Sequence, residues 1–75
     1  MNSTWYEVQE SLHVWEEQAF RARATLKQEV WDWVAMINDG AEQVELKLGI
    51  WNYWLIRFIT EHAQAQYVLR FGMPT

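Results

Sequence analysis

Apolar residues recur through most of this chain at alternating intervals of three and four residues. In the first half, the series runs through Trp5, Val8, Leu12, Trp15, Ala19, Ala22 and Leu26. In the second half, it runs through Ala41, Val44, Leu48, Trp51, Leu55, Phe58, His62, Ala65 and Leu69. Such alternation is typical of an apolar seam on a helix, whereas a strand repeats every two residues. The spacing therefore predicts two long helices.

Helix-breaking residues are few, and they mark where these helices end. Proline occurs once, at position 74, and glycine occurs at positions 40, 49 and 72. Only the stretch INDGAEQ, around Gly40, is a strong turn signal. We expect helix one over about residues 5–38, a turn over about 38–41, and helix two over about 41–71. Whether helix one breaks near Thr25, or helix two kinks at Gly49, stays open.

The two predicted helices carry capping residues at their ends. Thr4, followed three residues later by Glu7, forms a capping box at the start of helix one. Arg70 in the last turn, with Gly72 after it, is a typical end for helix two. The sequence thus predicts a single all-α domain over residues 1–75, in which two long antiparallel helices form a hairpin.

The segment IWNYWLIRFI, residues 50–59, carries more apolar side chains than one side of a helix can bury. In a helical hairpin, Trp51, Leu55 and Phe58 would close the seam between the helices. The side chains left uncovered would be Ile50, Tyr53, Trp54, Ile56 and Ile59, together with Trp31 and Val34 of helix one. Leaving five such groups in water forgoes on the order of 10 kcal/mol, which is comparable with the stability of a whole domain. We therefore predict that these residues form an interface.

Association is also the remaining route by which so short a chain gains stability. A chain of 75 residues has a small core, and this one contains no cysteine for disulfides or thiolate metal sites. A second copy is the simplest cover, because two hairpins form a four-helix bundle with coiled-coil packing. We expect a homodimer or a higher homo-oligomer, with another protein as the alternative partner.

Charge and terminal pattern bear on other partners and on location. The formal net charge is −4, with acidic and basic residues mixed along the chain. This balance disfavours nucleic acids and anionic lipid surfaces, because both attract basic patches. The first residues lack the basic and apolar regions of a secretion signal, and no stretch approaches about 18 consecutive apolar residues. We expect a soluble cytoplasmic protein.

Few residues suggest chemistry. Glu10 and His13 have the E-x-x-H spacing of di-iron bundles, but on the predicted helix both face outward as solvated residues. His62 falls on the seam of helix two, level with Glu17, where we expect a structural polar contact. The sequence offers no Ser-His-Asp set, no phosphate-binding glycine loop and no inward pair of carboxylates. We expect no catalysis, no metal site and no cofactor.

The function that this reasoning favours is a non-catalytic module that binds proteins through Trp-rich helix faces, such as an adaptor, inhibitor or assembly factor. The six tryptophans agree with it, because tryptophan is enriched among interface anchors. The one basic cluster, Arg21, Arg23 and Lys27, gives the alternative of a nucleic-acid-associated regulator or of contact with an acidic partner. A second alternative is a helix on a membrane surface, where Trp and Tyr are favoured.

Overall fold

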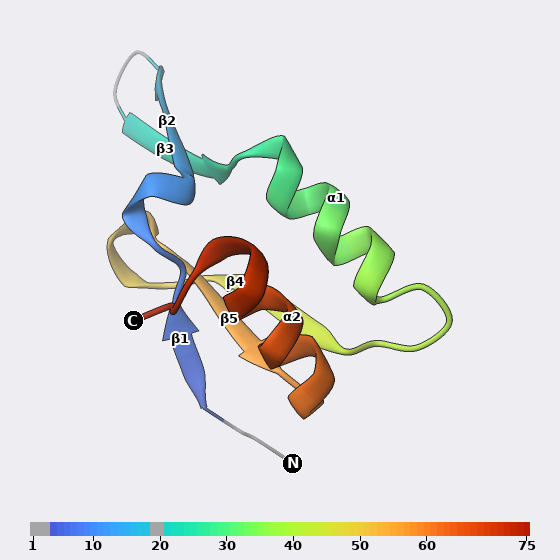
Figure 1. The fold of residues 1–75 in the computed structure, drawn as a ribbon. Helices are drawn as coiled ribbons and strands as arrows, with labels where there is room; N and C mark the ends of the chain where they lie inside the picture. The colour runs from blue at the N-terminus through green and yellow to red at the C-terminus, as the bar shows by residue number, and fades with distance from the viewer. Residues whose placement is uncertain (1–3, 19–20) are drawn as a thin grey trace.

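A computed structural model describes residues 4–18 and 21–75, with residues 16–18 and 21–23 described by their backbone alone. Within these residues the chain forms an α+β fold of two antiparallel sheets and two helices, so the predicted all-α hairpin, coiled coil and four-helix bundle are wrong (Figure 1). The elements are β1 (Trp5–Glu7), β2 (His13–Gln18), β3 (Arg21–Leu26), α1 (Gln28–Ile37), β4 (Val44–Leu48), β5 (Trp54–Phe58) and α2 (Glu61–Phe71). Short 3-10 turns lie at Glu10–Leu12 and Ile50–Asn52.

Three strands form the main sheet, in the order β1-β5-β4, and each neighbouring pair is antiparallel. The register pairs Val44 with Phe58, Leu46 with Ile56 and Leu48 with Trp54. Opposite residues share a face of the sheet, so these six side chains make one face apolar. Glu45 and Lys47 alternate with them along β4 and point to the other face.

Both helices begin and end at identifiable residues. α1 follows Lys27, which has extended backbone angles, and it ends at Asn38. α2 begins at Thr60, whose hydroxyl oxygen accepts a hydrogen bond from a backbone N–H of the first turn at 3.1 Å. It ends at Gly72, which has a φ of 91°, and Arg70 lies in its last turn, as the sequence predicts.

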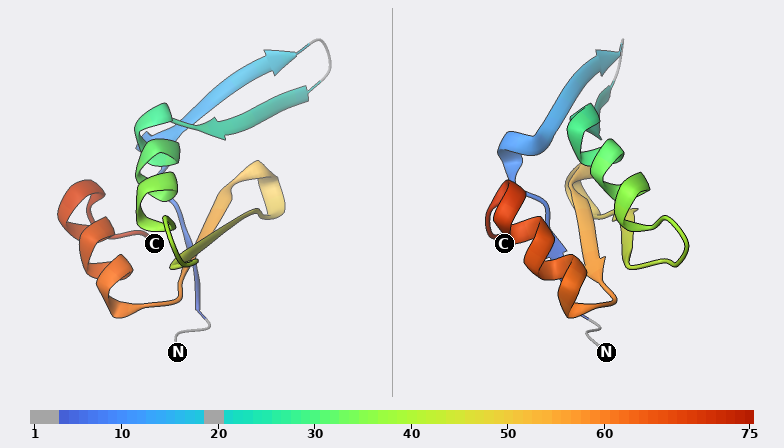
Figure 2. Two further views of the ribbon diagram at one scale, coloured as in Figure 1. Left: turned by 90° about the vertical axis from the view of Figure 1, so that its right-hand side faces the viewer. Right: turned by 45° about the vertical axis from the view of Figure 1, so that its right-hand side comes forward.

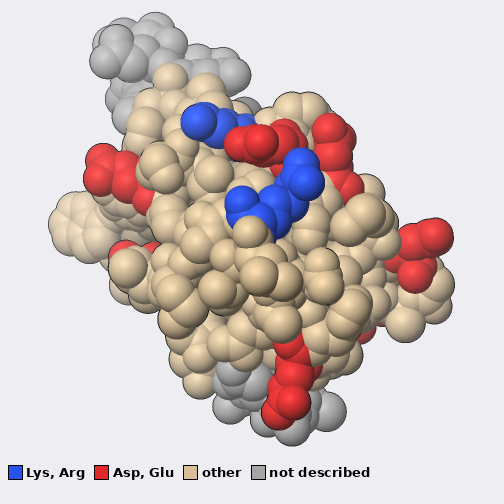
Figure 3. Space-filling model, in the orientation of Figure 1, with Lys and Arg blue, Asp and Glu red and all other residues tan. Residues whose placement is uncertain are grey.

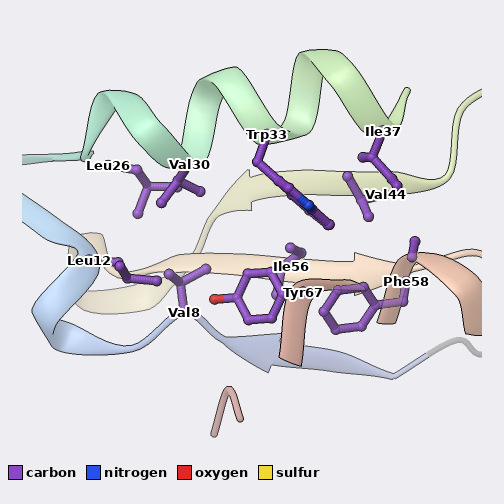
Figure 4. Packing of buried hydrophobic residues seen from close by; sticks show 11 residues of the cluster. Val8, Leu12, Leu26, Val30, Trp33, Ile37, Val44, Ile56, Phe58 and Tyr67 are labelled. Carbon is purple, nitrogen blue, oxygen red and sulfur yellow. The ribbon is translucent and has the colours of Figure 1, made fainter. Parts of the chain in front are cut away.

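The two helices pack on the apolar face of the main sheet, and their aromatic side chains meet there. Trp33 of α1 contacts Tyr67 and Phe71 of α2, with ring centroids 5.6 and 5.9 Å apart. Tyr67 also contacts Phe58 of β5, at 5.3 Å. The buried cluster comprises Val8, Leu12, Leu26, Val30, Trp33, Ile37, Val44, Ile56, Phe58, Ala63 and Tyr67 (Figure 4). Fully burying a large apolar side chain contributes about 1.5–3 kcal/mol, so this cluster dominates the stability of the fold.

Gln9 ties the segment after β1 to α2. Its carboxamide oxygen accepts a hydrogen bond from the Tyr67 hydroxyl, and its nitrogen donates to the Phe71 carbonyl at 2.9 Å. Burial disfavours the charged phenolate, so the pKa of Tyr67 lies well above its usual value. The end of the chain lies along the outer edge of β1, where Glu7 and Thr75 exchange two backbone hydrogen bonds.

β2 and β3 form a separate antiparallel hairpin. At its base the Lys27 N–H donates to the Leu12 carbonyl at 2.9 Å, which extends the hairpin ladder by one pair. The Trp54 indole of β5 donates to the Ala24 carbonyl of β3 at 3.0 Å and holds the hairpin against the main sheet. The β2–β3 hairpin and the loop between β4 and β5 project to the same side of the molecule (Figure 1 and Figure 2).

The boundaries predicted for the two long helices are wrong as well. Thr4 precedes a strand and therefore caps no helix, and within the described residues the first α-helix begins at Gln28, beyond Thr25. Gly49 lies in the loop between β4 and β5 rather than at a helix kink. His62 was expected on a buried seam, but it is exposed on the first turn of α2.

Candidate interaction surface

The loop that joins β4 to β5 exposes two large apolar side chains at its tip. The Gly49 N–H donates to the Tyr53 carbonyl at 2.7 Å and closes the loop. Ile50 is 82% exposed and Trp51 is 84% exposed. Trp51 has a φ of 66° and Asn52 a φ of 63°, both in the left-handed region. That conformation costs a residue with a side chain about 1–2 kcal/mol, so the loop holds an indole in water at the expense of stability.

Aromatic side chains from β2 and from the end of this loop meet below the tip. Trp15 contacts the ring of Tyr53 edge to face, with the centroids 5.6 Å apart. His13 contacts both rings, at 6.1 Å from Trp15 and 5.2 Å from Tyr53. We use the name hairpin-end surface for Trp15, Leu48, Ile50, Trp51 and Tyr53. Four of these five side chains are exposed, and Tyr53 is half-buried.

His13 is the polar residue that supports this surface from within. Its Nε2 accepts a hydrogen bond from the Trp54 N–H at 2.9 Å, and its Nδ1 lies 3.0 Å from the Gln9 carbonyl. A backbone N–H only donates, so Nε2 carries the lone pair and Nδ1 carries the proton. His13 is only 7% exposed, so its predicted role as a solvated surface residue is wrong. It links the start of β2 to β5.

A shallow groove of about 460 Å³ lies between α1 and β4. Its lining residues are Trp31, Val34, Asn38, Glu42, Val44, Glu45 and Leu46. The Asn38 carboxamide closes one end, because it donates to the Val44 carbonyl at 3.2 Å and accepts from the Val44 N–H at 3.0 Å. Trp31 also packs against the Trp54 ring, with centroids 5.2 Å apart.

The opposite face of the main sheet carries the charged residues of β4 and β5. Glu45 forms an ion pair with Arg57. The Lys47 ammonium lies 4.2 Å from the ring centroid of Trp5 on β1, and the Arg57 guanidinium lies 5.3 Å from the same ring. These cations therefore gather over an indole and a carboxylate, and they do not form an open basic patch.

The seven residues of the predicted interface fall into three groups. Ile50 is exposed at the loop tip, on the hairpin-end surface. Trp31 and Val34 line the groove, and the structure leaves them half-buried together with Tyr53, Trp54 and Ile59. Ile56 is fully buried in the core of its own chain, because it faces the helices from the middle of β5.

Three residues of this surface were missed by the sequence reasoning, and one basic cluster lies largely outside the described side chains. The missed residues were assigned to an internal seam, yet all three are exposed: Trp15, Leu48 and Trp51. Lys27 is exposed just before α1, whereas the side chains of Arg21 and Arg23 on β3 are outside the described part. The face of the molecule in Figure 3 shows basic groups lying next to acidic ones on a largely uncharged surface.

The described residues contain neither a metal-binding cluster nor a membrane-spanning helix. No group of three or more His, Asp or Glu side chains there lies close enough together to hold a metal ion. None of the described helices has both the length and the apolar character needed to cross a membrane. Comparison with protein-family models, with curated proteins and with solved structures gives no match.

Proposed function

We propose that this protein is a small non-catalytic interaction module that binds proteins, a second copy of itself included, through the hairpin-end surface. The observation that carries the proposal is the exposure of Ile50 and Trp51 on a loop whose backbone is left-handed. A loop selected for stability alone would place Asn or Gly at such positions. The strained, exposed position of Trp51 therefore supports contact with something outside the chain.

A protein partner suits the chemistry of this surface better than a nucleic acid or a lipid surface. Exposed Trp and Tyr side chains are typical anchors of protein interfaces. The net charge of −4 works against binding to phosphates and to anionic lipids. The interaction surface is formed by strands and a loop, in place of the helix faces expected from the sequence. A cytoplasmic location is part of the proposal, and cell fractionation tests it.

The test is sedimentation velocity of the wild type and three variants over a range of protein concentrations. Ile50→Ser and Trp51→Asn remove the two tip side chains, and Asn tolerates the left-handed backbone. Leu69→Ser is the matched control, because Leu69 is an apolar residue on α2 with the same 82% exposure as Ile50. We expect the wild type and the Leu69 variant to associate equally, and each tip variant to associate at least about tenfold more weakly, a loss of 1.4 kcal/mol or more.

Two results would contradict the proposal. The first is a wild-type chain that stays monomeric at every concentration. The second is flotation of the wild type with phosphatidylcholine vesicles that is lost in Trp51→Asn, because the loop tip would then be a membrane-inserting element.

A further inference from the structure

Each edge of the main sheet has part of its backbone covered by another segment of the chain. On the β1 edge, Glu7 pairs with Thr75. On the β4 edge, the Asn38 carboxamide occupies both backbone groups of Val44, as a neighbouring strand would. A bare strand edge is a template for pairing with another strand, and these contacts cap part of each edge.

The hydrogen-bond pattern identifies which residues of β4 face outward. The Ile59 N–H donates to the Gln43 carbonyl, and the Gly49 N–H donates to the Tyr53 carbonyl, so the odd-numbered residues of β4 point their backbone groups toward β5. Antiparallel strands alternate, so Val44, Leu46 and Leu48 point theirs away from the sheet. No described residue caps Leu46 or Leu48 in the way that Asn38 caps Val44. The free edge therefore consists of two residues.

We propose that β4 pairs antiparallel with β4 of a second copy about a two-fold axis at Lys47. In this register, Leu46 of the first chain lies opposite Leu48 of the second. By symmetry, Leu48 of the first chain lies opposite Leu46 of the second. Each of these pairs is of the hydrogen-bonded kind and exchanges two N–H···O bonds, so every free group of the edge finds a partner. Val44 keeps its own Asn38 and needs none. The proposal rests on the proposed function, because it specifies how the chain associates with itself.

The same register brings the loop tip of each chain to the groove of the other. A chain paired about Lys47 places its residue 50 level with residue 44 of its partner, where the Asn38 carboxamide ends the shared ladder. Val44 lines the groove together with Trp31 and Val34. The Ile50 side chain, 82% exposed in one chain, would enter this space of about 460 Å³. The contact occurs twice by symmetry, as an interface between identical surfaces requires.

The charges of β4 permit this pairing. Two Lys47 side chains would lie opposite each other, and like charges in such positions are destabilising. Lys47, however, reaches across the sheet to Trp5 on the far edge, so its ammonium points away from the axis. Glu45 is held by Arg57 on its own chain. Leu46 and Leu48 would meet on the apolar face, and Leu48, now 50% exposed, would become covered.

The deciding experiment is disulfide trapping with single cysteines. The natural chain contains no cysteine, so any disulfide must join the introduced residues of two copies. In the proposed register, residue 47 faces residue 47 of the second copy in a non-hydrogen-bonded pair, with Cα atoms about 4.5 Å apart, which suits a disulfide. Residue 45 faces residue 49 instead. We expect Lys47→Cys to form a covalent dimer at least tenfold faster than Glu45→Cys, although both side chains lie on the same face.

Amide hydrogen exchange of the wild type provides a second measurement that needs no substitution. Exchange of the Leu46 and Leu48 amides must proceed through the monomer, so it slows about tenfold when nine-tenths of the chains are paired. The Lys47 amide, already bonded within the sheet, serves as the internal reference. A chain that associates while the Leu46 and Leu48 amides stay unprotected, or while Glu45→Cys crosslinks as fast as Lys47→Cys, overturns this register and leaves the proposed function standing. A wild type that never associates overturns both.

Discussion

Replacing Trp51 by glycine tests whether its side chain contributes to the stability of the fold or only to association. Trp51 has φ 66° and ψ 19°, a left-handed conformation that costs about 1–2 kcal/mol and that glycine adopts freely. Glycine also adds conformational entropy to the unfolded chain, which offsets about 0.5–1 kcal/mol of this relief. The indole is 84% exposed, so little burial is lost. We expect Trp51→Gly to be between unchanged and about 1.5 kcal/mol more stable than the wild type.

The assay is urea denaturation followed by far-ultraviolet circular dichroism at a concentration where the chain is monomeric. Asn52→Ala is the matched control, because Asn52 has a φ of 63° in the same loop and alanine introduces left-handed strain. We expect that control to lose about 1 kcal/mol. A Trp51→Gly chain destabilised by more than about 1 kcal/mol would refute the reasoning, since the indole would then contribute packing to the fold. The informative outcome is a variant that keeps its stability and loses self-association.

Two further predictions concern the buried polar residues. His13→Ala should cost about 2–4 kcal/mol in urea denaturation, because it removes two hydrogen bonds and leaves the Trp54 N–H without its acceptor; a loss below about 0.5 kcal/mol would contradict the linking role of the imidazole. Burial raises the pKa of Tyr67, so above pH 10 its unfolded form ionises while its folded form stays neutral. The stability present below pH 10 should therefore fall by up to about 1.4 kcal/mol per pH unit above it, and Tyr67→Phe should lack this part of the slope in urea titrations between pH 9 and about 11.5.

The prediction of helices was wrong because residues four apart lie on the same face of a strand as well as of a helix. Val44 and Leu48 are four apart, and in β4 they also lie on one face because their separation is even. The interval of three from Leu48 to Trp51 does not fit one strand, and there the chain turns through the β4–β5 loop. The helical pattern placed Leu46 and Ile56 off the seam, whereas the structure pairs them on the apolar face of the sheet.

Some local signals in the sequence do indicate the observed structure. VELKL alternates strictly between apolar and charged residues, as a half-buried strand does. Gly49 and Asn52 flank a short segment between two apolar runs, which is a hairpin signal. Thr60 before α2 is a good N-cap. Arg70 and Gly72 were recognised correctly as the end of a helix.

The long-range contacts of the candidate site have no local signal. His13 accepts its hydrogen bond from Trp54, and these residues are 41 positions apart. Ile50 was selected as an interface residue because a helical hairpin left it uncovered, but its exposure arises from a turn in which it cannot pack. Burial depends on which strands pair, and β1 pairs with β5 from opposite ends of the chain. The spacing of apolar residues does not indicate which distant strands pair.

The spacing of three and four is nevertheless a property of the local sequence, and it should become visible when tertiary contacts are weakened. Trifluoroethanol loosens apolar packing and favours helices beyond their native content. We expect residues 41–59, which form β4, β5 and their loop in the native protein, to become helical in this solvent. The measurement is the Cα chemical shift of each residue. Shifts that stay extended or random across this segment would mean that its spacing has no helical tendency.

Gly49→Ala tests the same conflict from both sides, because it acts in opposite directions on the two structures. In the alcohol-induced helix, alanine should raise helicity, since it is more favourable than glycine by about 1 kcal/mol. In the native loop, the added Cβ would lie 2.8 Å from Leu55 Cδ1 and 3.2 Å from the Tyr53 carbonyl, so the folded chain should lose stability. Urea denaturation and circular dichroism in trifluoroethanol measure the two effects on one variant. A variant that gains native stability in urea as well as helicity in trifluoroethanol would place Gly49 in a helix. That result would contradict the hairpin, since the clash exists only where β4 turns back to β5.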